Sequence, residues 1–341
     1  MSVADAPAAR PVEVPTVRGP VPVDRLGLTL MHEHVFVLDT EVEANYPGRW
    51  DEDVRRDDAV RKLQAAAERG VRTLVDLTVL GLGRYVPRVR EVASRVDLNV
   101  VVATGLYTYD DVPMFFRFRG PGKLVDGPEL LTEFFVHDLT VGIADTGVRA
   151  AILKCATDRS GLTPGVERVL RSVAHAHRET GAPISTHTDA ATERGLDQQA
   201  VFREEGVDLD RVVIGHCGDS TDLDYLRRLM DAGSYIGMDR FGLDLILPFE
   251  ERVATVAELC AQGYAERMVL SHDASCFTHN FDVEVKERRM PHWQYTHLHD
   301  DVLPALRERG VSQQQIDQML IHNPRRILSR GAATGSAARR P

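Results

Sequence analysis

Short apolar segments of strand length alternate with longer amphipathic segments along most of the chain. The apolar segments are rich in Val, Ile and Thr, and their apolar positions run nearly without interruption. Near-continuous apolarity of this kind is typical of parallel strands that are covered on both faces. We predict eight strands, at 28–36, 73–78, 99–106, 150–157, 183–189, 212–218, 235–240 and 268–274.

The segments between these strands have the spacing and the end signals of helices. Residues 59–70 carry apolar side chains at helical spacing and end in glycine, and 222–233 repeats this pattern. Residues 163–181 open with Thr-Pro and close on glycine, which are start and stop signals of a helix. Eight strands that alternate with helices predict an α/β fold, and the number eight favours a closed (β/α)8 TIM barrel over an open doubly wound sheet.

The same pattern indicates one domain. We expect a single barrel domain over residues 16–330, a flexible N-terminal segment over 1–15 and a flexible tail over 331–341. The first fifteen residues are rich in Ala and Pro and lack the apolar core of a secretion signal. No GxGxxG motif follows the first strand, which weakens the alternative of a dinucleotide-binding fold.

Charge and cysteine content narrow the classes of partner. The chain of 341 residues has 41 Lys and Arg against 51 Asp and Glu, a formal net charge of −10. Such a chain has no overall attraction for nucleic acid or for an anionic membrane surface. Its four cysteines form no CxxC pair, and no apolar run reaches the length of about 18 residues that a membrane helix needs. We expect a cytoplasmic protein that acts on a small molecule.

Polar residues inside the predicted strands are the candidates for chemistry. His32 and His34 lie two positions apart on the first strand, so their side chains share one face while Glu33 points the other way. Two imidazoles at a strand end can bind one metal ion. A pair of histidines without any metal is an equally good interpretation of this motif alone.

Three further residues change that balance. His187, His216 and Asp273 lie at or near the ends of three later strands. A barrel assembles its active site from the carboxyl ends of different strands, so these side chains are expected to meet the first pair. Imidazole with carboxylate is a ligand set for Zn, Fe, Mn or Co rather than for calcium.

Lys154 is unusual because it lies inside an apolar strand, where a lone ammonium group is costly to bury. It can be paired with an acidic neighbour or reach solvent at the strand end. Alternatively, its neutral amine can react with carbon dioxide to give a carbamate, an anionic ligand that can bridge two metal ions. Burial favours the neutral amine that this reaction needs.

The chain resembles a known family, the phosphotriesterase-like amidohydrolases, and within it the phosphotriesterase-like lactonases. The resemblance covers about residues 16–328. It is carried by the segments GLTLMHEHVFV, VDLTVLGLGR, VVATGLYTY, ILKCATD, PISTHTDA, GLDQQAVFREEGVD, IGHCGDSTDLDYL, GMDRFGLD, LSHDAS and NPRRIL.

This resemblance implies a centre of two divalent metal ions, with zinc expected first and cobalt, iron or manganese as alternatives. The more buried ion would be held by His32, His34 and Asp273. The more exposed ion would be held by His187 and His216. Lys154, carboxylated, would bridge the two ions together with a hydroxide.

The family pattern also implies roles for three residues around the ions. Asp219 matches an acid involved in proton shuttling. Tyr107 matches a tyrosine beside the exposed metal and the lactone ring, and Arg240 matches an arginine near the substrate where the insecticide-hydrolysing branch has a histidine. The Tyr107 and Arg240 matches favour the lactonase branch.

The function implied in this way is hydrolysis of N-acyl homoserine lactones or related γ- and δ-lactones, with weak activity on organophosphate triesters. The bridging hydroxide would attack the carbonyl, and Asp273 would take up the proton. The alternatives are a true phosphotriesterase and, in another class, a catalytically inactive metal-binding barrel that binds a partner. The resemblance also suggests a homodimer.

The segment 275–297 has no clear element signal, and a loop of this length in a barrel is usually functional. Its apolar side chains could form a channel for an acyl chain or simply cap the barrel. They are Phe277, Phe281, Met290 and Trp293, of which we expect Phe277 and Trp293 to contact substrate. We interpret most of the remaining histidines as structural, among them His175, His177, His272, His292, His297, His299 and His322.

Overall fold

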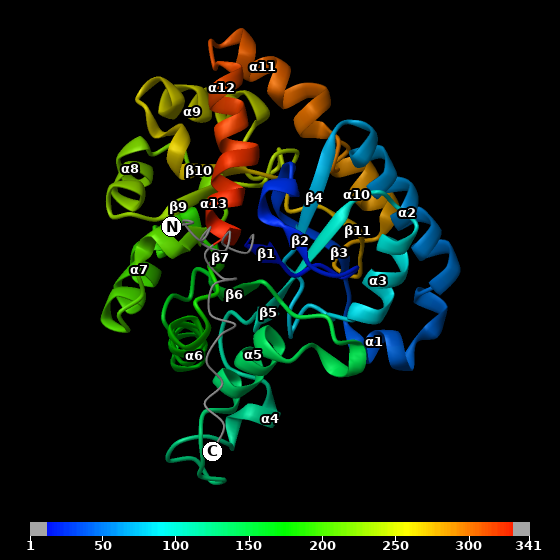
Figure 1. The fold of residues 1–341 in the computed structure, drawn as a ribbon, viewed down its shortest axis with the longest axis vertical. Helices are drawn as coiled ribbons and strands as arrows, with labels where there is room; N and C mark the ends of the chain where they lie inside the picture. The colour runs from blue at the N-terminus through cyan, green and yellow to red at the C-terminus, as the bar shows by residue number, and fades with distance from the viewer. Residues whose placement is uncertain (1–11, 330–341) are drawn as a thin grey trace, which may run out of the picture.

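The strands lie at the centre of the molecule and the helices lie around them in the computed structural model, which describes residues 12–329 (Figure 1). Their lengths follow the apolar runs, because only these runs can be buried on both faces. The central strands are β3 (Leu28–Val37), β4 (Val71–Asp76), β5 (Asn99–Gly105), β6 (Ile152–Thr157), β7 (Ile184–Thr188), β8 (Val212–Ile214), β9 (Tyr235–Met238), β10 (Met268–Leu270) and β11 (Ser275–Thr278).

The sheet runs in the order β10-β9-β8-β7-β6-β5-β4-β3-β11, with every neighbouring pair parallel. Its two outer strands, β10 and β11, are consecutive in the chain and are separated only by residues 271–274. The backbone N–H of Asp273 donates to the carbonyl of His32 at 3.0 Å, and that of His34 donates to the carbonyl of Ala274 at 2.9 Å. The eighth strand therefore pairs with the first, and the predicted (β/α)8 barrel is confirmed.

Helices surround the barrel, and most of them follow one another around it in chain order (Figure 1). They begin and end at the signals that the sequence contains: Thr163 accepts a hydrogen bond from the N–H of Val166 at the start of α6, and Gly181 ends it at a φ of 73°. The helices are α1 (Thr40–Asn45), α2 (Glu52–Glu68), α3 (Val86–Ser94), α4 (Met114–Arg117), α5 (Leu130–Thr140), α6 (Pro164–Thr180), α7 (Arg194–Glu204), α8 (Leu223–Asp231), α9 (Phe249–Ala261), α10 (Val283–Arg289), α11 (Leu303–Glu308), α12 (Gln313–Asp317) and α13 (Asn323–Ser329).

Two predicted boundaries differ from the structure. Helix α2 begins at Glu52 rather than at residue 59, because the Asp51 side chain accepts a hydrogen bond from the N–H of Val54 and caps it there. The described part of the predicted flexible segment 1–15 belongs to the fold, since β1 (Glu13–Val14) pairs with β2 (Val21–Pro22). The rest of that segment, and the predicted tail 331–341, lie outside the described residues.

The prediction of a loop without elements over 275–297 is wrong, because this segment contains β11 and α10. The four residues of β11 carry little strand signal of their own and become a strand by pairing with β3. Lys62 of α2 and Lys286 of α10 donate hydrogen bonds to the carbonyls of Cys276 and Ser275, at 2.7 and 3.0 Å. Tertiary contacts therefore decide the structure of this segment.

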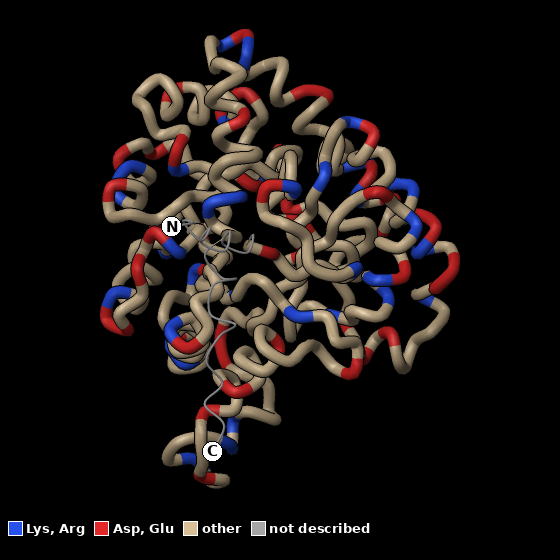
Figure 2. Tube along the Cα trace, viewed as in Figure 1, with Lys and Arg blue, Asp and Glu red and all other residues tan. Residues whose placement is uncertain are grey.

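Basic and acidic residues are interspersed over the outer helices (Figure 2). Arg171 on α6, for example, forms ion pairs with Glu167, Glu204 and Glu205. Charged side chains on these helices therefore meet partners of opposite sign nearby. Within residues 12–329 there is also no helix with the length and apolarity that a bilayer span requires.

Glu33 holds the turn at which the barrel closes. Its side chain is fully buried and points away from His32 and His34, as the strand alternation predicts. The carboxylate accepts hydrogen bonds from the N–H groups of His272 and Ala274, at 2.9 and 2.8 Å, and it contacts the His272 ring at 2.6 Å and the Ser271 hydroxyl at 3.0 Å. Glu33 thereby fixes the backbone on both sides of Asp273.

We expect the substitution Glu33→Gln to lower the free energy of unfolding by about 3 kcal/mol, because a neutral amide replaces a carboxylate that accepts several buried hydrogen bonds. Urea denaturation of the two proteins checks this value. The matched control is Glu41→Gln on exposed α1, which should leave the midpoint unchanged. Equal midpoints for Glu33→Gln and the native chain would contradict the structural role of Glu33.

Candidate metal centre

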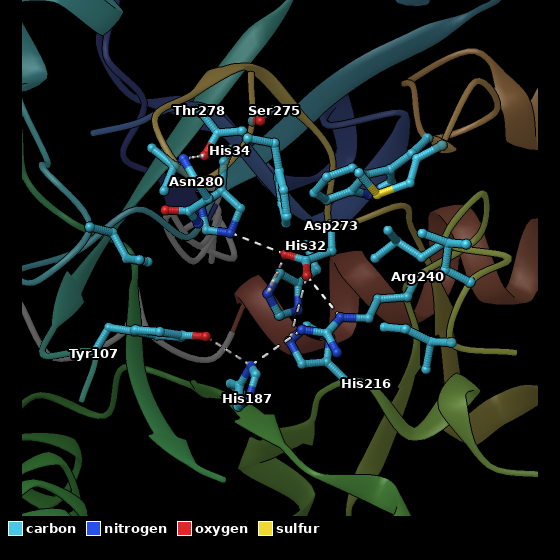
Figure 3. A pocket seen from close by; sticks show the side chains of 18 of the residues that line it. His32, His34, Tyr107, His187, His216, Arg240, Asp273, Ser275, Thr278 and Asn280 are labelled. Carbon is cyan, nitrogen blue, oxygen red and sulfur yellow. Dashed lines mark hydrogen bonds and ion pairs between the residues drawn. The ribbon is translucent and has the colours of Figure 1, made fainter. Parts of the chain in front are cut away.

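Six polar side chains meet at the carboxyl end of the barrel, and they are the six that the sequence predicts as metal ligands. Figure 3 labels all of them except Lys154. His32 Nε2 lies 2.9 Å from Lys154 Nζ, and His34 Nε2 lies 3.2 Å from an oxygen of Asp273. They lie on or just after five strands: His32 and His34 on β3, Lys154 on β6, His187 on β7, His216 two residues after β8 and Asp273 in the turn after β10.

Asp239, directly after β9, orients two of these histidines. Its carboxylate oxygens contact His32 Nδ1 at 2.8 Å and His216 Nδ1 at 3.0 Å, and one of them also accepts the backbone N–H of His216 at 2.8 Å. The carboxylate is completely buried. With both Nδ1 atoms engaged, the Nε2 atoms of the two rings face Asp273, at 3.6 and 3.8 Å.

The other two histidines are held in the same way. His34 Nδ1 contacts the Thr78 hydroxyl at 2.9 Å, and His187 Nε2 contacts the Asp158 carboxylate at 2.9 Å. Each of the four rings therefore has one nitrogen bonded to a neighbouring oxygen and the other directed into the centre. This is the arrangement of histidines that bind metal ions, in which a second contact fixes the ring and its tautomer. The donor set fits divalent transition metals.

Burial sets the charge of these groups. It lowers the pKa of His32 and His216 well below the ordinary value, and it lowers the pKa of His187 to about 4. These rings are therefore neutral near pH 7, as metal binding requires. Burial also lowers the pKa of Lys154 to about 8. A measurable share of its amine is then neutral, which suits the predicted carboxylation.

Asp273 stays ionised for a different reason. Burial by itself would raise the pKa of its carboxyl group, but the nearby Arg240 guanidinium and the hydrogen bond with His34 hold that pKa well below its ordinary value. Arg240 Nε donates to an Asp273 oxygen at 2.9 Å. The carboxylate is therefore ionised near pH 7 and available as a metal ligand.

Two of the six groups have strained backbones. His216 has a φ of 59° and Asp273 a φ of 56°, the left-handed region that non-glycine residues seldom occupy. Such a conformation costs on the order of 1–3 kcal/mol and persists where surrounding contacts hold it, as Asp239 and Glu33 do here. Both strained residues point into the centre, and strained backbones of this kind are common at functional sites.

Three further predicted residues surround the six groups: Arg240, Asp219 and Tyr107. Arg240 Nη1 donates to Asp219 at 2.9 Å, and the other Asp219 oxygen forms an ion pair with Arg252 at 2.7 Å. Asp219 thus reaches Asp273 only through Arg240. The Tyr107 hydroxyl lies 3.2 Å from His187 Nδ1 (Figure 3), and it also contacts the hydroxyl of Tyr109.

A cavity of about 490 Å³ opens above the centre. Its floor is polar and consists of the groups described above, while its wall is largely apolar and includes Leu82, Leu243, Leu245, Ile246, Phe281 and Trp293. Trp293, Phe281 and Met290 of the segment 275–297 therefore reach the cavity. A pocket with an apolar wall and a few polar groups at one end is suited to a small organic molecule.

Phe277, which we expected to contact substrate, does not line this cavity. It is buried with its ring 5.4 Å from the ring of Trp50 and 4.2 Å from the guanidinium carbon of Arg55, a residue of α2. The pairing of β11 with β3 places Phe277 opposite Phe36, whose ring also packs on Trp50. Phe277 therefore belongs to the core between the barrel and α2.

Sequence reasoning missed Asp239, Asp158 and Tyr109. Each stands close to a residue that it did select: Asp239 precedes Arg240, Asp158 follows the strand of Lys154, and Tyr109 is two positions after Tyr107. Acidic residues at strand ends were a usable signal for the first two. The direction of their side chains is visible only in the folded chain.

We expect Asp239→Asn to weaken metal binding by about 10–100-fold, because an amide cannot hold two imidazole N–H groups as the carboxylate does. Metal content after dialysis against a buffered chelator measures the effect. Asp97→Asn is the matched control, since Asp97 is exposed two residues before β5, at the other end of the barrel. An unchanged metal content in Asp239→Asn would mean that this carboxylate does not support the site.

Comparison with known proteins gives a consistent result. The model of the Phosphotriesterase family matches residues 12–328. The chain is 60% identical over 319 residues to a "Phosphotriesterase homology protein" of Mycobacterium tuberculosis, covering 93% of this chain and 98% of that protein. It is 37% identical over 306 residues to an "Aryldialkylphosphatase" of Saccharolobus solfataricus, covering 89% of this chain and 95% of the relative.

A solved structure shows the same fold. The chain superimposes on the phosphotriesterase from Mycobacterium tuberculosis with a TM-score of 0.92 and 60% sequence identity. The match covers 93% of this chain and 98% of the other.

Proposed function

Since the chain belongs to the phosphotriesterase family and is a metal-dependent hydrolase acting on ester bonds, we propose that its substrates are lactones. The substrates are N-acyl homoserine lactones or related γ- and δ-lactones, with weak side activity on organophosphate triesters. The observation that carries this proposal is the cavity, whose apolar wall ends at Tyr107, Arg240 and the six converging groups. An acyl chain fits the wall, and the lactone ring fits the polar end.

We propose that the centre holds two divalent metal ions, zinc in the first instance. His32, His34 and Asp273 would hold one ion, and His187 with His216 would hold the other. Lys154 would join them as a carbamate, which carbon-13 NMR after incubation with labelled bicarbonate would detect. When bound, the ions supply Lewis acidity and lower the pKa of water to near neutrality.

The protein residues contribute positioning and proton transfer. The Asp273 carboxylate is ionised and faces the cavity, so it accepts the proton released when water adds to the carbonyl. Tyr107 and Arg240 present a hydroxyl and a guanidinium at the same end of the cavity, where they orient the ring and stabilise the leaving oxygen. The apolar wall excludes water from the acyl side.

Asp219 acts as a positioning residue in this proposal rather than as a proton outlet. Arg240 stands between Asp219 and Asp273, with 2.9 Å contacts to both. A guanidinium is already fully protonated and stays so in proteins, so it cannot pass on a proton from Asp273. Asp219, itself held by Arg252, fixes the direction of Arg240 instead.

A true phosphotriesterase is the second candidate. The relative named aryldialkylphosphatase, at 37% identity, favours it. Arg240 favours the lactonase. Its contact with Asp273 holds the guanidinium in place, so that a fixed cation occupies the polar end of the cavity. The third possibility, an inactive barrel that binds a partner, is opposed by the complete and oriented set of donor groups.

We propose a homodimer, supported by exposed apolar side chains on and around α4 and α5, and light scattering would detect it. These side chains are Met114, Phe115, Phe118, Leu124, Val125 and Phe134. We also propose that the protein is cytoplasmic, which cell fractionation would test.

We expect Asp273→Asn to reduce kcat for lactone hydrolysis by at least about 10²-fold, since it removes both a ligand and the proton acceptor, while the circular dichroism spectrum stays native. Chelation should abolish activity in the native chain, and Zn²⁺ should restore it. Asp219→Asn is the comparison, in which we expect a smaller loss of kcat and an unchanged pH profile.

Full activity in Asp273→Asn would exclude Asp273 from both roles. The absence of any ester hydrolysis that metal restores would favour the inactive barrel.

We expect kcat/KM for an N-acyl homoserine lactone to exceed kcat/KM for an aryl dialkyl phosphate, because the acyl chain uses the apolar wall and the triester does not. Steady-state kinetics on one preparation of metal-loaded protein measures both values. A preference for the phosphate by several orders of magnitude would overturn the lactonase proposal and leave the metal-dependent hydrolase in place.

A further inference from the structure

A second group of metal-binding side chains lies outside the centre described above. It consists of His292, His297 and Asp301, each of which offers a nitrogen or oxygen within 4.8 Å of the others. His292 follows α10, while His297 and Asp301 lie four residues apart at the helical turn Leu298–Val302. Spacing of four residues places two side chains on one side of a helix.

His297 is the informative member of this group. It is 3% exposed, and its Nδ1 contacts a carboxylate oxygen of Asp301 at 2.7 Å. Its other ring nitrogen, Nε2, is buried and has no hydrogen-bond partner among the described residues. The contact with Asp301 accounts for Nδ1 of His297 but not for Nε2, and a buried ring nitrogen without a partner is costly.

His292 completes the group from the other side. Its ring lies 5.3 Å from the ring of His297, centre to centre, with 36° between the planes. Its backbone is held close to Gly242, where an added Cβ would lie 2.3 Å from the carbonyl oxygen of His292. The ring of Phe249 packs against the ring of His297, with 5.5 Å between the ring centres. Packing therefore holds the backbone of His292 and the ring of His297 in place.

We propose that His292, His297 and Asp301 bind a third divalent transition-metal ion. Two imidazoles with one carboxylate form a ligand set for Zn²⁺ and its neighbours in the first transition row rather than for Ca²⁺ or Mg²⁺. Three protein ligands leave a position for water, because His292 and Asp301 are exposed. The group lies on one stretch of chain, 292–301, and shares no residue with the binuclear centre.

The ion would stabilise one wall of the substrate cavity. Trp293 follows His292 directly, lines the cavity, and donates a hydrogen bond from Nε1 to the carbonyl of His272 at 2.8 Å. A metal ion that ties His292 to the turn at 298–302 therefore fixes the position from which the indole enters the cavity. The role is structural and belongs to the segment that contacts the acyl end of the substrate.

The test is a titration of the untagged, metal-loaded protein with Zn²⁺ by calorimetry after dialysis. We expect one further equivalent per chain beyond those of the binuclear centre. His292→Ala and Asp301→Asn should each weaken it by at least about tenfold, and both side chains are exposed, so the fold should persist. His175→Ala is the matched control, because His175 is also exposed and contacts Glu205 at 2.9 Å without a third ligand.

Two results would overturn the proposal. One is the absence of a further equivalent, and the other is a further equivalent that His292→Ala and Asp301→Asn both leave unchanged. A second measurement locates the ion: the chain has two tryptophans, so in a Trp50→Phe background the emission reports Trp293 alone. We expect this emission to change in step with the further equivalent, whereas binding without any change would place the ion elsewhere.

Discussion

The seam at which the eighth strand meets the first sets the geometry of the whole site. Hydrogen bonds across this seam join Asp273 to His32 and His34 to Ala274, and so bring three predicted ligands from opposite ends of the chain together. Glu33 holds the seam from its other face, through the backbone on both sides of Asp273. One strand thus serves two purposes through its alternation: its histidines face the centre, and the residue between them closes the barrel.

A second constraint is the direction of the imidazole rings. Asp239 contacts His32 and His216, which the proposed function assigns to different ions, so a single buried carboxylate links the two halves of the centre. The donor atoms are therefore in place before any ion or substrate binds. Such preorganisation lowers the barrier of metal-assisted hydrolysis, because the groups that stabilise the transition state need not reorganise during the reaction.

The segment after the last strand connects this centre with the surface. Its first part, β11, belongs to the barrel wall, and its second part places Trp293 at the cavity and His292 beside His297. The proposed substrate preference and the proposed third metal ion therefore rest on the same short stretch of chain. This arrangement allows the cavity wall to vary while the strand ends that hold the centre remain fixed.

The sequence by itself determined the number of barrel strands, their approximate limits and the six side chains that converge, because burial on both faces leaves an apolar run in which His34, Lys154 or His187 stands out. It did not determine β11, which is a strand only through its pairing with β3, nor the inward and outward directions that separate Trp293 from Phe277. It also missed Asp239, whose role depends on contacts with residues 23 and 207 positions away. Strand identity is local and can be predicted from composition and periodicity, whereas the partner of each side chain is decided by closure of the barrel.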